Sequence, residues 1–207
     1  MKSLVLILLL FQLFSFAQIK TFNEKINNPR YKIEKLISIN KSDTISKIDK
    51  YFNLIDIGVC YFKLGDINMS YEHHTKASTL IKDLDVAYSY KANIEIFQYK
   101  NYASGLKSIK KAIKHNKFNG EIIDTMSMIN YYVNCAFCYE KIGKYKSAIK
   151  LYNKLILLDP NNSEHLIDRG INFYNLGLTE EACEDFKKAI LLGNKILLDD
   201  FGITCNH

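Results

Sequence analysis

The spacing of apolar and polar residues predicts a chain made of short amphipathic helices. From residue 51 to residue 194, apolar side chains return every three or four positions, and each run ends at a turn that contains Gly or Asn. Each turn separates two runs of helical length, so the pattern predicts an all-α fold of four helix-turn-helix units. The turns are Leu64–Asp66, Lys100–Asn101, Ile142–Lys144 and Leu176–Gly177.

The units repeat with a regular period. Equivalent residues in the last two units, such as Gly143 and Gly177 or Ala148 and Ala182, are 34 positions apart. A period of this size indicates stacked repeats, since one hairpin cannot bury its own apolar face. We place the units at residues 51–84, 86–119, 129–162 and 163–194, with a turn-rich insertion at Asn116–Gly120 between the second and third.

Several positions within the units have a clear packing role. Small residues at Gly58, Ala148, Gly170 and Ala182 would let the two helices of a unit approach closely. Aromatic residues would fill the space between neighbouring units. They are Tyr61, Tyr139, Tyr152, Phe173 and Phe186.

In these residues the chain resembles the tetratricopeptide repeat proteins, whose unit has the same length. The third unit matches that family's pattern with Tyr132, Tyr139, Ala148, Tyr152 and Pro160, although Cys135–Ala136 replaces its Leu-Gly pair. The fourth matches with Gly170, Phe173, Ala182, Phe186 and Ala189, although Asn194 stands where Pro is expected. The resemblance implies an α-solenoid of about four repeats.

The resemblance also implies a concave groove lined by the first helix of each unit, which would bind an extended peptide or a helix. Relatives that clamp a C-terminal carboxylate have Lys and Asn where Ile55 and Val59 stand here, so that mode of binding is not expected. In this register the groove residues are Phe52, Ile55, Val59, Phe62, Tyr90, Ile94, Phe97, Val133, Phe137, Glu140, Ile167, Ile171 and Tyr174.

The two ends of the repeat array need covering. Residues 18–50 contain one weak amphipathic pattern at Tyr31–Asn40, which predicts a short helix. This helix could fold back into the groove, which would make the protein a structural one with a self-filled groove. Residues 195–207 can form a short helix that caps the last unit.

The N-terminal residues 1–17 have the three regions of a secretory signal peptide. Lys2 precedes an apolar run from Leu4 to Phe14, and small residues at Ser15 and Ala17 suit cleavage before Gln18. The run is shorter than a membrane span requires. We therefore expect an exported protein, in the periplasm or outside the cell, without an integral span after cleavage.

The net charge of +6 is unevenly distributed. Lysines concentrate between Lys100 and Lys117, where they could meet an anionic partner or a membrane surface, or form only the solvated face of one helix. No aromatic or Gly-rich nucleic-acid motif accompanies them, so a nucleic-acid partner is not expected.

Five cysteines in an exported chain leave at least one unpaired. If the last repeat helix and the cap are antiparallel, Cys183 and Cys205 lie at similar distances from the turn between them, and either a disulfide or two buried thiols would result. Cys135 and Cys138 have the spacing of a redox pair but lie in mid-helix, where nothing lowers a thiol pKa.

These observations favour a non-catalytic exported scaffold that binds a protein or peptide. A thiol oxidoreductase that uses Cys135 and Cys138 is the enzymatic alternative. No catalytic constellation, phosphate loop or ligand set with metal spacing is visible, so we expect no cofactor and no metal.

Overall fold

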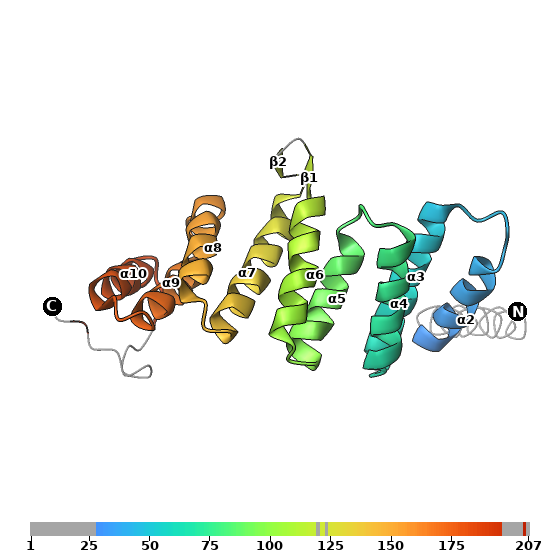
Figure 1. Cartoon of the computed structure of the whole chain (residues 1–207), viewed down its shortest axis with the longest axis horizontal. Helices are drawn as coiled ribbons and strands as arrows, with labels where there is room; N and C mark the ends of the chain where they lie inside the picture. The colour runs from blue at the N-terminus through green and yellow to red at the C-terminus, as the bar shows by residue number, and fades with distance from the viewer. Residues whose placement is uncertain (1–27, 119–120, 123, 196–204, 206–207) are drawn as a thin grey trace, which may run out of the picture. The chain divides into compact units, whose positions relative to one another are not determined.

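A computed structural model of the chain describes residues 28–118, 121–122, 124–195 and 205. The expected signal peptide and nearly all of the expected C-terminal cap lie outside the described residues. The chain divides into two compact units, one ending at Ile81 and the other beginning at Lys82. Figure 1 shows that both units are built of α-helices that follow one another along the chain.

The described part of the first unit contains three helices, in which α2 and α4 both pack against α3. Asn28 caps α2, because its Oδ1 accepts a hydrogen bond from the backbone N–H of Arg30 at 2.9 Å, and Pro29 occupies the first turn. Ser46 caps α3 in the same way through the N–H of Asp49. The helices are α2 (Pro29–Asn40), α3 (Lys47–Lys63) and α4 (Ile67–Leu80).

The second unit is a series of three helical hairpins, and each helix packs against the next. In Figure 1 helix α7 lies between α6 and α8. Stacked hairpins of this kind are the α-solenoid expected from the repeats. The elements are α5 (Val86–Asn93) with a π-helical turn η1 (Ile94–Gln98), α6 (Tyr102–His115), α7 (Thr125–Lys141), α8 (Tyr145–Leu158), α9 (Ser163–Tyr174) and α10 (Thr179–Leu191).

The insertion between α6 and α7 contains a small antiparallel hairpin, which the sequence did not predict. Strand β1 (Lys117–Phe118) pairs with β2 (Glu121–Ile122), and each is too short to show an alternating pattern. The buried side chain of Asn116 fastens this region. Its Nδ2 donates to Asp85 Oδ2 at 2.9 Å, and its Oδ1 accepts from the N–H of Asp124 at 3.1 Å.

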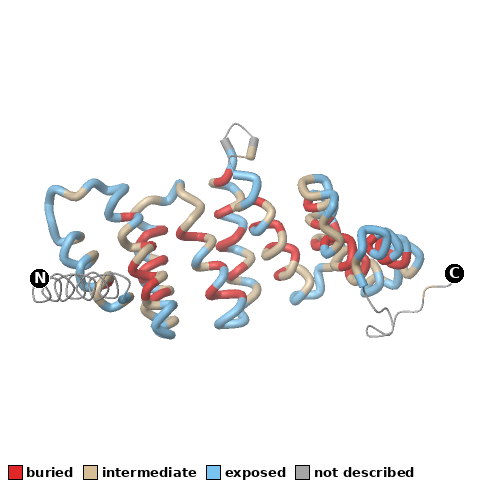
Figure 2. The backbone as a smooth tube through the Cα atoms, turned by 180° about the vertical axis from the view of Figure 1, so that it is seen from behind, coloured by how far each residue is buried: buried red, intermediate tan, exposed pale blue. Residues whose placement is uncertain are grey.

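Buried residues recur along the helices from α3 to α10 (Figure 2), and small residues lie where helices approach most closely. A Cβ atom on Gly170 would lie 2.6 Å from the Phe186 ring, and one on Gly58 would lie 2.6 Å from the His74 ring. Ala148 and Ala182 are fully buried. The predicted packing role of these four positions is confirmed.

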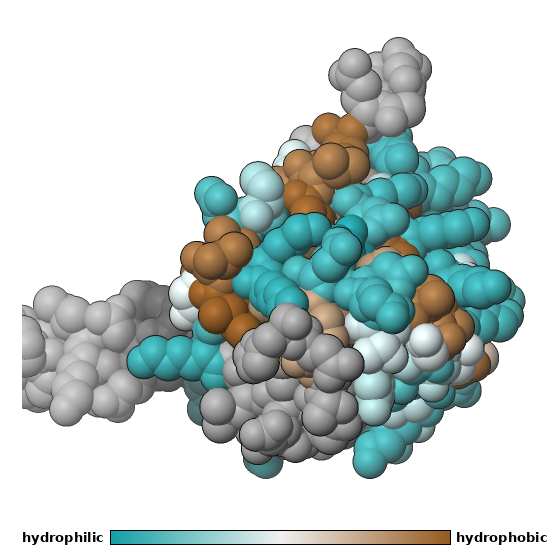
Figure 3. All heavy atoms as spheres, turned by 90° about the vertical axis from the view of Figure 1, so that its left-hand side faces the viewer, coloured by the Kyte–Doolittle hydropathy of each residue, from teal (hydrophilic) through white to brown (hydrophobic). Residues whose placement is uncertain are grey.

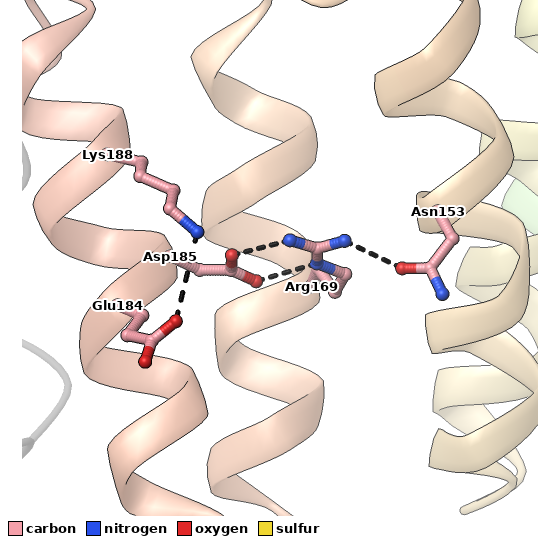
Figure 4. Close-up of polar contacts among 5 residues, drawn as sticks. All are labelled: Asn153, Arg169, Glu184, Asp185 and Lys188. Atoms are coloured by element: carbon pink, nitrogen blue, oxygen red, sulfur yellow. Dashed lines mark hydrogen bonds and ion pairs between the residues drawn. The ribbon is translucent and has the colours of Figure 1, made fainter.

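A charged contact joins three helices of the second unit (Figure 4). Arg169 on α9 donates from Nε and Nη2 to the two carboxylate oxygens of Asp185 on α10, at 2.7 and 2.6 Å. Its Nη1 donates to Asn153 Oδ1 on α8 at 2.7 Å. Because Asp185 is only 2% exposed, this bidentate pair neutralises a carboxylate that lies inside the fold.

Candidate functional site

The groove residues of the first unit differ in exposure. Phe52 and Phe62 on α3 are 48% and 46% exposed, whereas Ile55 between them is buried and Val59 is half-buried. Helix α3 therefore presents two phenylalanine rings to solvent, while Ile55 contributes to packing within the unit.

Helix α2 packs on another side of α3. Ile33 of α2 lies in a small core with Ile57 and Cys60 of α3, and Lys32 Nζ is 2.7 Å from Asp56 Oδ2. Phe52 and Phe62 remain exposed beside this contact. In this unit α2 covers the flank of the first repeat and leaves the two rings open.

In the second unit an aromatic cluster spans two consecutive repeats. Phe97 of η1 stacks on Phe137 of α7, with ring centroids 5.8 Å apart, and Tyr102 of α6 meets Phe137 edge-on at 6.0 Å. The Lys141 ammonium lies 5.0 Å from the centre of the Phe137 ring. Phe97 is 51% exposed, so this contact, the Phe97 cluster, lies at the surface.

The other expected groove residues of this unit fall into three classes of exposure. Tyr90 and Tyr174 are exposed, and each lies on the first helix of its repeat. Ile94 and Ile167 are buried and serve the core. The half-buried positions are Val133, Phe137, Glu140 and Ile171.

Phe97 lies in the π-helical turn at the end of the first helix of its repeat. Three consecutive residues of this turn, Ile94, Glu95 and Ile96, are buried, whereas Phe97 is exposed. Glu95 Oε1 accepts a hydrogen bond from Ser104 Oγ at 2.8 Å. The sequence contains no proline or glycine signal for this turn, so periodicity alone missed it.

An acidic corner lies where α7, α8 and α9 meet. Burial raises the pKa of Asp168 to about 6, and the neighbouring Glu140 carboxylate adds to this effect, while a hydrogen bond from the Tyr152 hydroxyl opposes it. Burial also raises the pKa of Tyr152. Asn172 Nδ2 donates to the Asp168 backbone carbonyl at 2.8 Å and lies 3.4 Å from Glu140 Oε2. The sequence predicted Glu140 as a groove residue and Tyr152 as a packing residue, but the repeat spacing does not show that Asp168 and Asn172 lie beside them.

The Cys135 and Cys138 thiols are unsuited to redox chemistry. Both are buried in α7 and unpaired, and burial raises the pKa of Cys135 to about 11 and that of Cys138 to about 12. Each thiol therefore stays protonated near neutral pH, whereas a redox-active cysteine reacts as the thiolate.

A disulfide joins Cys183 of α10 to Cys205, whose Cα atoms are 5.6 Å apart. Cys205 also packs against the core of the last repeat, which contains Phe186 and Ala189. The bridge therefore holds the chain near its C-terminus against α10.

Within the described residues, no group of three or more His, Cys, Asp or Glu side chains could hold a metal ion. A search of the same residues finds no helix with the length and apolar character of a membrane span.

Comparison with known proteins identifies one repeat directly. Residues 129–162, which contain most of α7 and all of α8, match the family model of the tetratricopeptide repeat. A TPR repeat-containing protein of Methanocaldococcus jannaschii is 27% identical over 171 residues, which are 82% of this chain and 28% of that protein. The chain thus spans little more than a quarter of the length of this relative.

Solved structures share the fold. Two crystal structures of MamA superpose with TM-scores of 0.64 and 0.65, at 22% and 19% identity, and cover 78% and 92% of this chain and 86% and 93% of theirs. One chain of the Cut9–Hcn1 hetero-tetramer of APC/C superposes with a TM-score of 0.59 at 15% identity. The superposition covers 72% of this chain and 29% of that chain. These likenesses show the tetratricopeptide solenoid fold.

Proposed function

We propose that this protein is a non-catalytic, exported interaction scaffold that binds an apolar peptide segment or an amphipathic helix. In the second unit, the first helices of the repeats form the binding surface. The observation that carries the proposal is the Phe97 cluster, in which a half-exposed ring is stacked across two repeats. The tetratricopeptide match adjoins it, because Phe137 lies in the matched repeat.

The cluster has the properties of an anchor site. Stacking on Phe137, which Tyr102 in turn meets edge-on, fixes the Phe97 ring in position, so little side-chain entropy remains to be lost on binding. An apolar side chain of a partner would cover the exposed half of the ring. Lys141 and Glu140 beside it could hold polar groups of the same segment.

A photo-crosslinking amino acid at Phe97, in the native host, tests this proposal. We expect a discrete crosslinked protein, and we expect Phe137→Ala to abolish it because the stacked ring loses its support. Ala103, exposed on the second helix of the same repeat, is the control position and should give no such product. Equal products from both positions, or none from Phe97, would refute the proposed binding surface.

Export is the second part of the proposal and rests on residues 1–17. We expect the cellular protein to begin at Gln18 and to fractionate outside the cytoplasm. Mass spectrometry of the N-terminal peptide measures the first expectation. A cytoplasmic protein that retains Met1–Ala17 would contradict it and leave the crosslinking experiment unaffected.

The self-filled groove is the alternative. It predicts that deletion of residues 29–40 increases crosslinking from Phe52, since the helix would otherwise compete for that surface. The position of α2 on another side of α3 supports the open surface instead.

A further inference from the structure

A basic face covers the second helices of two repeats in the second unit. Its lysines are exposed and recur at spacings of three or four, which places them on one stripe of each helix. Neither helix contains Asp or Glu. The stripes consist of Lys107, Lys110, Lys111 and Lys114 on α6, and Lys146, Lys150 and Lys154 on α8.

The two stripes border the same helix. Lys110 of α6 lies over the Tyr139 ring of α7 at 5.1 Å, and Lys154 of α8 lies over the Tyr132 ring of α7 at 5.4 Å. Both ammonium groups act on the pKa of the buried Cys135 thiol between them, which they lower against the larger effect of burial. The lysines of α6 and α8 therefore lie on the two flanks of α7. Together they form one basic face.

No carboxylate neutralises this face within the described part of the chain, where none of its lysines forms an ion pair. Lys107 and Lys111 lie close enough to Lys91 to oppose its charge, and both act to lower its pKa, although burial is the larger cause. Asp159, just beyond α8, accepts a hydrogen bond from Asn162 at 3.1 Å instead. The stripes are thus an accumulation of like charge.

The chemistry of the face favours a surface over a shaped ligand. All its cations are lysines, which act as flexible point charges and lack the planar fork that arginine offers to a single phosphate. Leu157, one helical turn beyond Lys154 at the C-terminal end of the α8 stripe, is 82% exposed. Figure 3 views the second unit from its α10 end, where hydrophobic patches lie within a mostly hydrophilic surface. On the basic face, lysines beside a protruding leucine suit the headgroup region of a bilayer.

We propose that the basic face on α6 and α8 docks the protein peripherally on an anionic phospholipid bilayer. The lysine ammonium groups contact lipid phosphates, and Leu157 enters the boundary between headgroups and acyl chains. The basic face shares no residue with the Phe97 cluster, so a bound partner and the bilayer would contact different side chains.

Vesicle partitioning of the full protein tests the electrostatic part. The readout is the ratio of partitioning between vesicles that contain phosphatidylglycerol and vesicles of phosphatidylcholine alone, which removes any contribution from the apolar N-terminus. One lysine near an anionic bilayer contributes roughly fivefold, so reversal of four should lower the ratio at least about 100-fold. The test variant combines Lys107→Glu, Lys114→Glu, Lys146→Glu and Lys150→Glu. The control variant combines Lys35→Glu, Lys41→Glu, Lys47→Glu and Lys50→Glu.

The control has the same net charge as the test variant, and its lysines are equally exposed. A ratio near that of the unaltered protein is expected for the control. Equal losses in both variants would show that net charge alone drives association, and would overturn the proposal. A ratio near one for the unaltered protein would do the same.

A fluorophore sensitive to polarity, attached to a Leu157→Cys variant, separates a bilayer from a soluble polyanion. Labelling is selective because the native free thiols are buried. We expect a blue shift with anionic vesicles and none with polyphosphate, and no shift with either for a label at Lys50→Cys. An unshifted label at residue 157 on saturating vesicles would overturn the assignment to a bilayer.

Discussion

Replacement of Asp168 by Asn should stabilise the protein at neutral pH. The carboxylate of Asp168 is mostly buried, and Glu140 lies beside it. Burial, together with the Glu140 charge, raises the pKa of Asp168 from an ordinary 3.8 to about 6. This difference corresponds to an upper limit of about 3 kcal/mol by which ionisation of Asp168 destabilises the fold. The variant also loses the carboxylate that accepts the hydrogen bond of the Tyr152 hydroxyl. This loss offsets about 1 kcal/mol of the stabilisation. We expect a net gain of roughly 1 to 2 kcal/mol.

The pH dependence gives the sharper test. Because the folded pKa exceeds the unfolded one, the contribution of Asp168 is fully present below about pH 4 and is lost as the pH rises through about 6. The advantage of Asp168→Asn in urea unfolding should therefore be largest near pH 8 and disappear near pH 4. Glu184→Gln, which alters an exposed carboxylate, should change little at either pH. An advantage that does not vary with pH would refute the reasoning.

Three further changes test other contacts in the same unit. Arg169→Met should cost about 3 to 5 kcal/mol in urea unfolding, because it leaves Asp185 buried without its cation, and a loss below 1 kcal/mol would contradict that role. Gly170→Ala should cost about 1 to 3 kcal/mol by the same measurement, since the new methyl group meets the Phe186 ring, and an unchanged midpoint would show that the ring can move. Cys205→Ser should remove about 3 kcal/mol, and an intact mass after denaturation and alkylation that shows five free thiols instead of three in the native protein would contradict the bridge.

Sequence periodicity predicted the helical hairpins well because packing enforces it. Gly170 and Phe186 must meet for the last hairpin to close, so their types are constrained by contact. Which apolar residues on the first helices reach solvent was harder to predict. Ile94 and Phe97 both read as groove residues, yet Ile94 is buried and Phe97 is exposed.

Polar contacts between repeats were also out of reach of the sequence. Asp185 lies in an acidic run with Glu181 and Glu184, and nothing in its type separates it from them. Only its place beside Phe186 on the buried stripe, together with Arg169 on the preceding helix, distinguishes it. The corner formed by Glu140 and Asp168 depends likewise on how two helices cross.

The Arg169 contact has a consequence for how the array opens. Asn153 belongs to the second helix of one repeat, and Asp185 belongs to the second helix of the next. A terminal repeat held only by apolar contact could fray alone, because repeat arrays unfold by nearest-neighbour steps. Here one guanidinium ties it to the repeat before it. Backbone amides of α8 and α10 should therefore exchange with solvent through a shared opening event.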